Sequence, residues 1–74
     1  MSADLTRLPL CSPVLELRPE FGRTRVTFKR LAAIYYVADD NPRRDEILAA
    51  LRASLESGGD VELTYDLVTK NLDR

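Results

Sequence analysis

Side chains able to do chemistry are few in this chain of 74 residues, and none of them forms a catalytic pattern. The sequence contains no histidine and a single cysteine, Cys11. Without histidine there is no Ser–His or Cys–His pair and no ordinary acid–base group near neutral pH. A lone cysteine becomes a reactive thiolate only beside a cation, and a free cysteine more often behaves as a small apolar residue. We therefore expect no enzyme activity and no small-molecule substrate.

Oxygen ligands for a metal occur together once, at residues 39–41 and Asp45. Hard cations prefer such ligands, but the spacing lacks the acidic run and the closing glutamate of a calcium loop. A turn followed by the start of a helix explains the same residues. The glycine pair at 58–59 follows a helical pattern instead of preceding one, which is the wrong order for a phosphate-binding loop. We expect no metal site and no cofactor.

Charge is unevenly distributed although the formal net charge is only −1. Residues 1–30 hold six Lys/Arg against three Asp/Glu, whereas residues 31–74 hold five against nine. The basic cluster at 18–30 consists of Arg18, Arg23, Arg25, Lys29 and Arg30. Such a cluster can attract the phosphates of a nucleic acid, but the solvated face of an antiparallel hairpin accounts for it as well.

Three tyrosines are the other candidates for contact with a partner. Adjacent residues of a strand point to opposite faces, so one of Tyr35 and Tyr36 must point outward or lie at an interface. An outward tyrosine beside Lys29 and Arg30 is able to stack on a nucleic-acid base or to anchor a protein partner. The candidate partner-binding residues are Arg25, Lys29, Arg30, Tyr35, Tyr36, Tyr65 and Leu67.

The element most clearly encoded is an amphipathic helix over about 42–57. Asn41 is a favoured N-cap residue, and Pro42 suits the first helical position. A glycine pair at 58–59 is typical of a helix end. The apolar residues at helical spacing are Ile47, Leu48, Leu51 and Leu55. This stripe is expected to pack on a sheet.

A strand follows the helix directly. Val61, Leu63 and Tyr65 alternate with polar residues, which is the period of a half-buried strand. Residues 70–71 are typical of a reversal, with a returning strand near residue 72, although the strand can instead continue past residue 66. A reversal there leaves a strand edge at 61–68 with unpaired backbone groups, to which a partner strand can be added.

The first half of the chain is harder to interpret. Residues 1–13 are expected to be a loose leader because two prolines oppose a central strand. A short strand is expected over 14–17, then a turn over 19–22 with Phe21 folded back onto the core. Residues 23–38 fit a strand bent by a bulge or a hairpin of two strands, or else a helix over 28–38. We favour strands, since four strand formers end the segment and no C-cap residue precedes Asp39.

Together these elements predict one α+β domain over residues 14–74. It consists of a small, mostly antiparallel sheet or partly open barrel of about three to five strands, packed on one helix; the alternative is a helix-turn-helix with a β-hairpin. The order strand, helix, strand resembles small barrels of the OB and SH3 kinds, at the level of fold only and without a shared motif.

The function expected from these observations is that of a small non-enzymatic interaction module. A chain this short buries only about 60% of its unfolded surface, so association with a protein partner or with its own copies through a sheet edge is expected. Nucleic-acid binding through the basic cluster and an exposed tyrosine is the alternative. The sequence has no signal-peptide pattern and no membrane-spanning run, which favours a cytoplasmic protein without membrane contact.

Overall fold

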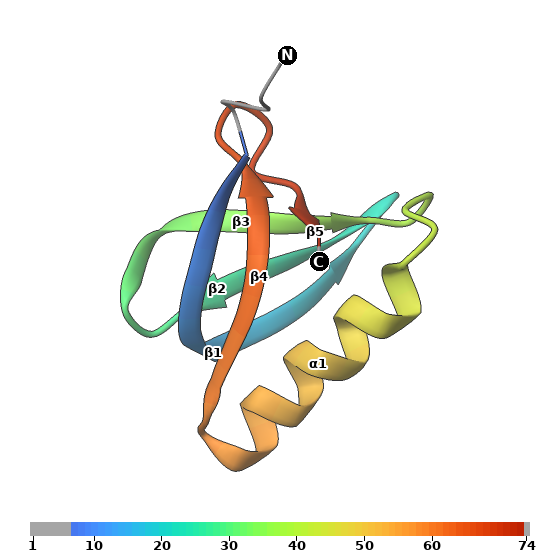
Figure 1. The fold of residues 1–74 in the computed structure, drawn as a ribbon. Helices are drawn as coiled ribbons and strands as arrows, with labels where there is room; N and C mark the ends of the chain where they lie inside the picture. Colours follow the sequence, from blue (N-terminus) through green and yellow to red (C-terminus); the bar gives the residue numbers. More distant parts are fainter. Residues whose placement is uncertain (1–6, 74) are drawn as a thin grey trace.

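Six elements follow one another along residues 7–73, the part of the chain that a computed structural model describes. They are β1 (Arg7–Glu20), β2 (Arg23–Phe28), β3 (Leu31–Ala38), α1 (Arg44–Ser57), β4 (Asp60–Asp66) and β5 (Leu72–Asp73). The strands form one antiparallel sheet in the order β3-β2-β1-β4-β5 (Figure 1). The expected α+β architecture is thus confirmed. The helix-turn-helix alternative is wrong, because residues 28–38 form strands joined by a turn.

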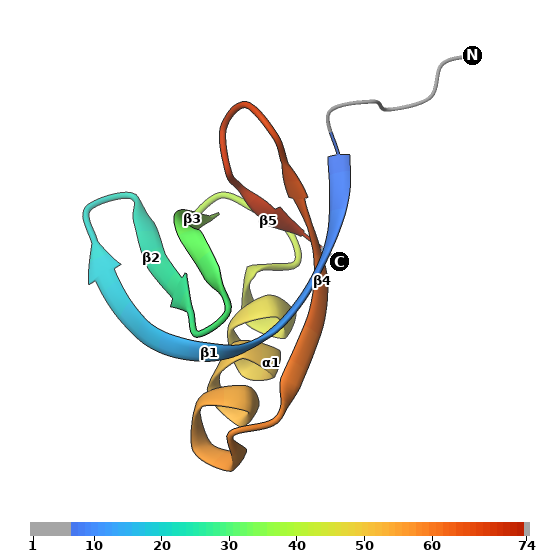
Figure 2. The ribbon, with the colours of Figure 1, turned by 90° about the vertical axis from the view of Figure 1, so that its left-hand side faces the viewer.

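A single long strand, β1, curls the sheet because it pairs with two different neighbours. Residues 7–13 pair with β4 and residues 14–20 pair with β2, and Figure 2 shows the bend between the two halves. At the far border, the amide of Tyr36 in β3 donates to the carbonyl of Lys70 at 2.9 Å, and Tyr36 forms a parallel bridge with Asn71. This contact between β3 and the segment before β5 closes the sheet into a partly open barrel with the strand order β1-β2-β3-β5-β4-β1. The same order is found in the Greek-key barrel of the OB type.

The prolines of β1 do not prevent it from being a strand. Residues 7–13, expected to belong to a loose leader, form its first half; residues 1–6 of that expected leader lie outside the described part. This half has a neighbouring strand on one side only. The Pro13 carbonyl points away from β4, since it accepts from the Lys29 amide. The nitrogen of Pro13 points to the same side as its carbonyl, and so does that of Pro9, four residues earlier in the strand. The missing N–H groups of both prolines therefore leave the β1–β4 ladder intact.

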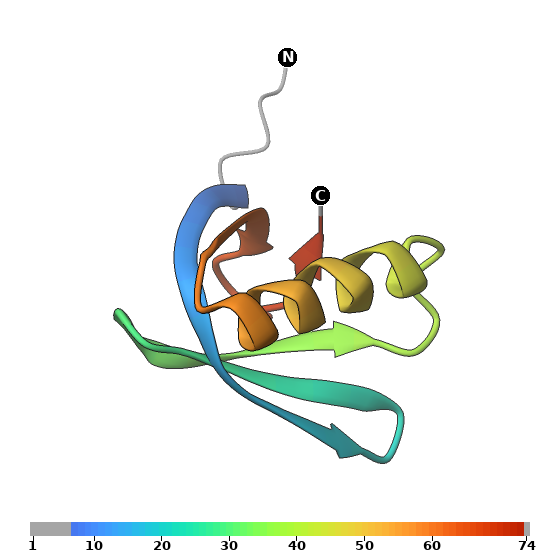
Figure 3. The same cartoon turned by 90° about the horizontal axis from the view of Figure 1, so that it is seen from below.

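Helix α1 begins two residues later than the sequence indicates. Pro42 and Arg43 form a turn, in which the Asn41 side-chain oxygen accepts from the Arg43 amide at 2.7 Å. The helix ends at Ser57 as expected, with Gly58 in the left-handed conformation. It lies across the lower end of the barrel and contacts β1, β3 and β4 (Figure 3). With 14 residues it is shorter than the roughly 20 needed to cross a membrane, and residues 7–73 contain no longer helix.

The hydrophobic core lies between α1 and the inner face of the sheet. Ile47, Leu48 and Leu51 are buried as expected, but Leu55 is 43% exposed and Ser54 is buried in its place. The strands contribute Leu10, Val14, Val26, Phe28, Tyr35, Val37, Val61, Leu63 and Leu72. Because these side chains come from all five strands, the core joins both halves of the curled sheet.

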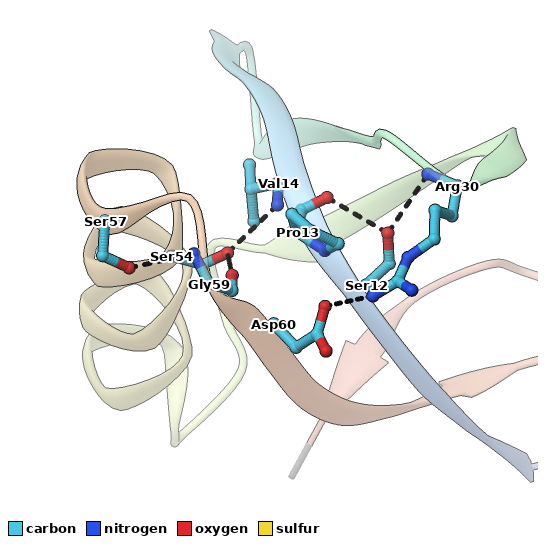
Figure 4. A network of polar contacts seen from close by, with 8 residues as sticks. All are labelled: Ser12, Pro13, Val14, Arg30, Ser54, Ser57, Gly59 and Asp60. Carbon is cyan, nitrogen blue, oxygen red and sulfur yellow. Dashed lines mark hydrogen bonds and ion pairs between the residues drawn. The ribbon is translucent and has the colours of Figure 1, made fainter.

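Two buried serines bond to backbone groups at the bend of β1. The Ser54 hydroxyl accepts from the Val14 amide at 3.0 Å and donates to the Gly59 carbonyl at 2.5 Å. The Ser12 hydroxyl accepts from the Arg30 amide at 3.2 Å (Figure 4). Backbone groups that leave a strand ladder in the interior must find other partners. These serines thus connect the bend to the end of α1 and to the β2–β3 turn.

Replacing Gly58 with alanine is expected to lower the free energy of unfolding by about 1 kcal/mol. Its φ is 77°, where a side chain is strained, although an added Cβ meets no atom within 4 Å. Asparagine tolerates this conformation better, so Gly58→Asn should cost less. Urea denaturation of the two variants compares them directly. An equal loss for both would contradict a purely conformational cause.

Candidate interaction surface

The outer face of β1, β2 and β3 gathers charged and aromatic side chains in cross-strand rows. Register places Arg25 of β2 between Arg18 of β1 and Tyr36 of β3. The neighbouring row contains Arg23, whose guanidinium carbon lies 3.8 Å from the centroid of the Tyr36 ring. This is the geometry of a cation–π contact. We call Arg18, Arg23, Arg25 and Tyr36 the arginine–tyrosine face.

Each arginine of this face has an acidic neighbour. Glu20 pairs with Arg23 at 3.1 Å and with Arg25 at 3.6 Å, and Glu16 pairs with Arg18 at 3.2 Å. All of these side chains are substantially exposed, so each pair contributes only about 0–1 kcal/mol and exchanges readily. The face is therefore close to neutral, with guanidinium groups that can turn to another partner.

Two of the predicted tyrosines belong to the interior instead. Tyr35 is 4% exposed, and its ring meets the rings of Phe28 and Tyr65 edge-on, with centroids 5.4 Å and 5.0 Å away. Burial, and then the neighbouring Tyr65, raise the pKa of Tyr35, which keeps its phenol neutral. Because the Tyr35 side chain packs in the core, Tyr36 is the member of the adjacent pair that points outward, as the alternation of a strand predicts. Tyr65 is half-buried behind it.

The other predicted residues lie apart from the arginine–tyrosine face. Lys29 and Arg30 form the β2–β3 turn, and Arg30 pairs with Asp60 of β4. The expectation that they flank the outward tyrosine is wrong, because the cross-strand register brings other arginines to Tyr36. Leu67 is 46% exposed in the turn after β4.

The strand edge expected at 61–68 is only partly open. β4 pairs with β1 over its whole length, and with β5 on its other side at Thr64 and Tyr65. The expected reversal near residues 70–71 is present, and Lys70 adopts a positive φ there. The chain thus covers part of this edge itself, while residues 60–63 keep one unpaired side within the described part of the molecule.

Phe21 is the most exposed apolar side chain of residues 7–73, and the expectation that it folds onto the core is wrong. Its relative exposure is 104%. Gly22 beside it has a φ of 79°, and the Asp39 amide donates to the Gly22 carbonyl at 3.1 Å. This bond fixes the β1–β2 turn to the loop before α1. Of the turn expected over 19–22, only residues 21–22 form it, because Pro19 and Glu20 still belong to β1. The direction of Phe21 depends on the orientation of the hairpin.

Acid is expected to remove a stabilising contribution of Asp66. Its carboxylate accepts from the Thr69 amide at 3.0 Å and the Val68 amide at 2.8 Å, and these bonds, Thr69 first, hold its pKa below the ordinary value of 3.8. A pKa lowered by folding means that the ionised group stabilises the fold above about 3.8 and that this contribution disappears as the pH falls further. The unfolding free energies of wild type and Asp66→Asn should therefore converge below about pH 4. A constant difference from pH 7 to pH 2 would contradict this role.

Nothing in the described residues assigns a reaction to these surfaces. Within residues 7–73, no three His, Cys, Asp or Glu side chains converge as metal ligands, and Cys11 is exposed. Comparison with protein-family models, with curated proteins and with solved structures finds no match for the chain. The exposed side chains are therefore the features that point to a function.

Proposed function

We propose that the protein is a non-enzymatic protein-interaction module whose contact surface consists of Phe21 and the adjoining arginine–tyrosine face. The observation that carries this proposal is the complete exposure of Phe21 at the end of a turn that is fixed to the barrel. An aromatic ring in that position contributes no burial to folding, but offers a large apolar surface to another molecule.

The composition of the surface supports a protein as the partner. Aromatic residues and arginine are enriched in the contact residues of protein interfaces and account for most of their binding energy. Phe21 is adjacent to Arg23, which stacks on Tyr36. The glutamates beside the arginines leave little net charge, which suits the mixed surface of a protein better than a row of phosphates.

We place the proposed contact on this face instead of at a strand edge, because the free edges suit strand addition poorly. The free side of the first half of β1 carries Pro9 and Pro13, which lack the N–H that strand addition needs. The edge of β3 is interrupted by an irregular register near Phe28 and by its bridge to Asn71. Strand addition is therefore restricted to short segments.

An affinity-capture experiment with matched variants tests the proposal. The wild type, Phe21→Ser and Leu55→Ser are immobilised, since Leu55 is an exposed apolar residue on α1, away from the proposed surface. A specific partner should be retained by the wild type and by Leu55→Ser, but lost from Phe21→Ser. Retention by all three at equal levels, also after nuclease treatment, would contradict Phe21 as the anchor.

Single-stranded nucleic acid is a second candidate, favoured by the strand order. Barrels of the OB type bind oligonucleotides on the face of their second and third strands. In this chain that face carries Arg25 opposite Tyr36. Binding of an oligodeoxythymidylate that weakens steeply with salt and is lost in Arg25→Gln would favour this function. No retardation at low salt excludes it.

A further inference from the structure

A shallow hollow lies on the outer surface of the β1–β4 ladder. It is lined by Pro9, Cys11, Glu62 and Thr64, with Leu10 beside them, and its wall is mainly apolar. Its volume is about 530 Å³, which is ample for an aromatic ring. The exposed thiol of Cys11 stands within it. No activity or contact derived above uses this hollow.

The hollow and Phe21 lie at opposite ends of β1. Ten residues separate Cys11 from Phe21, which corresponds to about 33 Å along a strand. The intervening strand is paired with β2 and its bend is bonded to Ser54, so Phe21 cannot reach the hollow of its own chain. The apolar ring and the apolar hollow can meet only between two molecules.

Charges beside the two features are complementary. Phe21 is two residues from Arg23, whose acidic partner within residues 7–73 is the partly exposed Glu20. Glu62 on the wall of the hollow is exposed and forms no ion pair within residues 7–73. The Arg23 guanidinium of one copy can therefore pair with the Glu62 carboxylate of another. Doing so costs little, because the Arg23–Glu20 pair that it gives up is exposed and weak.

We propose that Phe21 of one copy inserts into the hollow on β1 and β4 of a second copy, with Arg23 beside Glu62. This inference depends on the proposed interaction function and names its occupant. A second copy also supplies the association that a core of this size favours. Because every copy carries both the ring and the hollow, the contact needs no other component.

The absence of tryptophan from the sequence makes the proposal directly measurable. In Phe21→Trp the only tryptophan replaces the inserting ring. Between about 10 µM and 1 mM protein, its emission should shift to shorter wavelength and its quenching by acrylamide should fall at least about twofold, in step with an increase in mass by sedimentation equilibrium. Leu55→Trp is the matched control and should remain quenchable throughout.

Blocking the hollow provides the second arm of the experiment. Alkylation of Cys11, the only thiol in the chain, with a bulky maleimide should keep the tryptophan at position 21 exposed at 1 mM. Glu62→Arg should have the same effect without a chemical modification. Circular dichroism of both samples establishes that they remain folded.

Three results would overturn the inference. They are a tryptophan at position 21 that stays fully quenchable at 1 mM, an increase in mass without protection of that tryptophan, and protection that survives both blocks of the hollow. The tryptophan can stay exposed while capture of another protein still requires Phe21. In that case the proposal of a second copy as the partner is wrong, and the proposed interaction function stands. If capture is also independent of Phe21, the proposed function fails as well.

Discussion

Leu51→Ala is expected to remove most of the protein's net stability at 25 °C. Leu51 is 0% exposed and lies between the helix and the sheet. Truncation of a buried leucine costs about 2–5 kcal/mol, through lost burial and the cavity that remains. A single core in a chain of this length supplies roughly 3–5 kcal/mol of net stability. Circular dichroism and a urea titration should therefore show a greatly weakened or absent transition.

Leu55→Ala is the matched control for this prediction. The two leucines are four residues apart on α1, but Leu55 is 43% exposed. Its truncation should lower the free energy of unfolding by well under half as much as Leu51→Ala does, because much of the Leu55 side chain already faces water. Equal losses for the two variants would contradict the placement of Leu55 outside the core.

Ser54→Ala is expected to lower the free energy of unfolding by about 1–3 kcal/mol. The Ser54 hydroxyl accepts from the buried Val14 amide and donates to the Gly59 carbonyl. Alanine removes both bonds and leaves the Val14 N–H in the interior without its partner. The penalty for an unsatisfied buried donor exceeds the net value of an ordinary hydrogen bond.

Ser57→Ala is the matched control, because it also removes a serine hydroxyl from α1 but leaves the bond to the Val14 amide in place. Ser57 is exposed and accepts from the Gly59 amide at 3.1 Å. Its replacement should change the unfolding free energy by less than about 0.5 kcal/mol, as surface substitutions usually do. Hydrogen exchange of the Val14 amide identifies the hydrogen bond to Ser54 as the cause. The amide should exchange slowly in wild type and in Ser57→Ala, and rapidly in Ser54→Ala. Val14 protection that survives in Ser54→Ala would contradict the assignment.

Local patterns were sufficient to predict the helix and the strand after it. Leu48 and Leu51 on α1, and Val61 and Leu63 on β4, show the periodicities of elements with one buried face, and they are buried. The strand interpretation of residues 31–38 is also confirmed, because consecutive strand formers outweigh a chance helical spacing.

Features that depend on distant neighbours could not be predicted in this way. Pro9 and Pro13 are incompatible with a strand only where that strand has neighbours on both of its edges. The bend that leaves one edge of β1 free is not visible in the local sequence. Ser54 is buried where Leu55 was expected, and its hydroxyl accepts from the Val14 amide at this bend. A contact between residues 40 positions apart in the sequence leaves no trace in the local pattern of α1.

The proposed interaction surface follows only in part from the sequence, for the same reason. Arg25 and Tyr36 were among the candidates, but their contact depends on cross-strand register. Arg23 stacks on Tyr36 from the next row, and only the pairing of β2 with β3 reveals this. The expectation that Phe21 folds onto the core is wrong because the direction of its side chain depends on the orientation of the β1–β2 hairpin, which no local pattern shows.

Photo-crosslinking from position 21 shows whether Phe21 contacts a protein in the cell. The residue is replaced by p-benzoylphenylalanine in the full chain, and the protein is irradiated in the cells that produce it naturally; position 55 receives the same replacement as the control. The account predicts adducts with protein, including the chain itself, from position 21 and not from position 55. Adducts that disappear on nuclease treatment, or equal labelling from both positions, would contradict it.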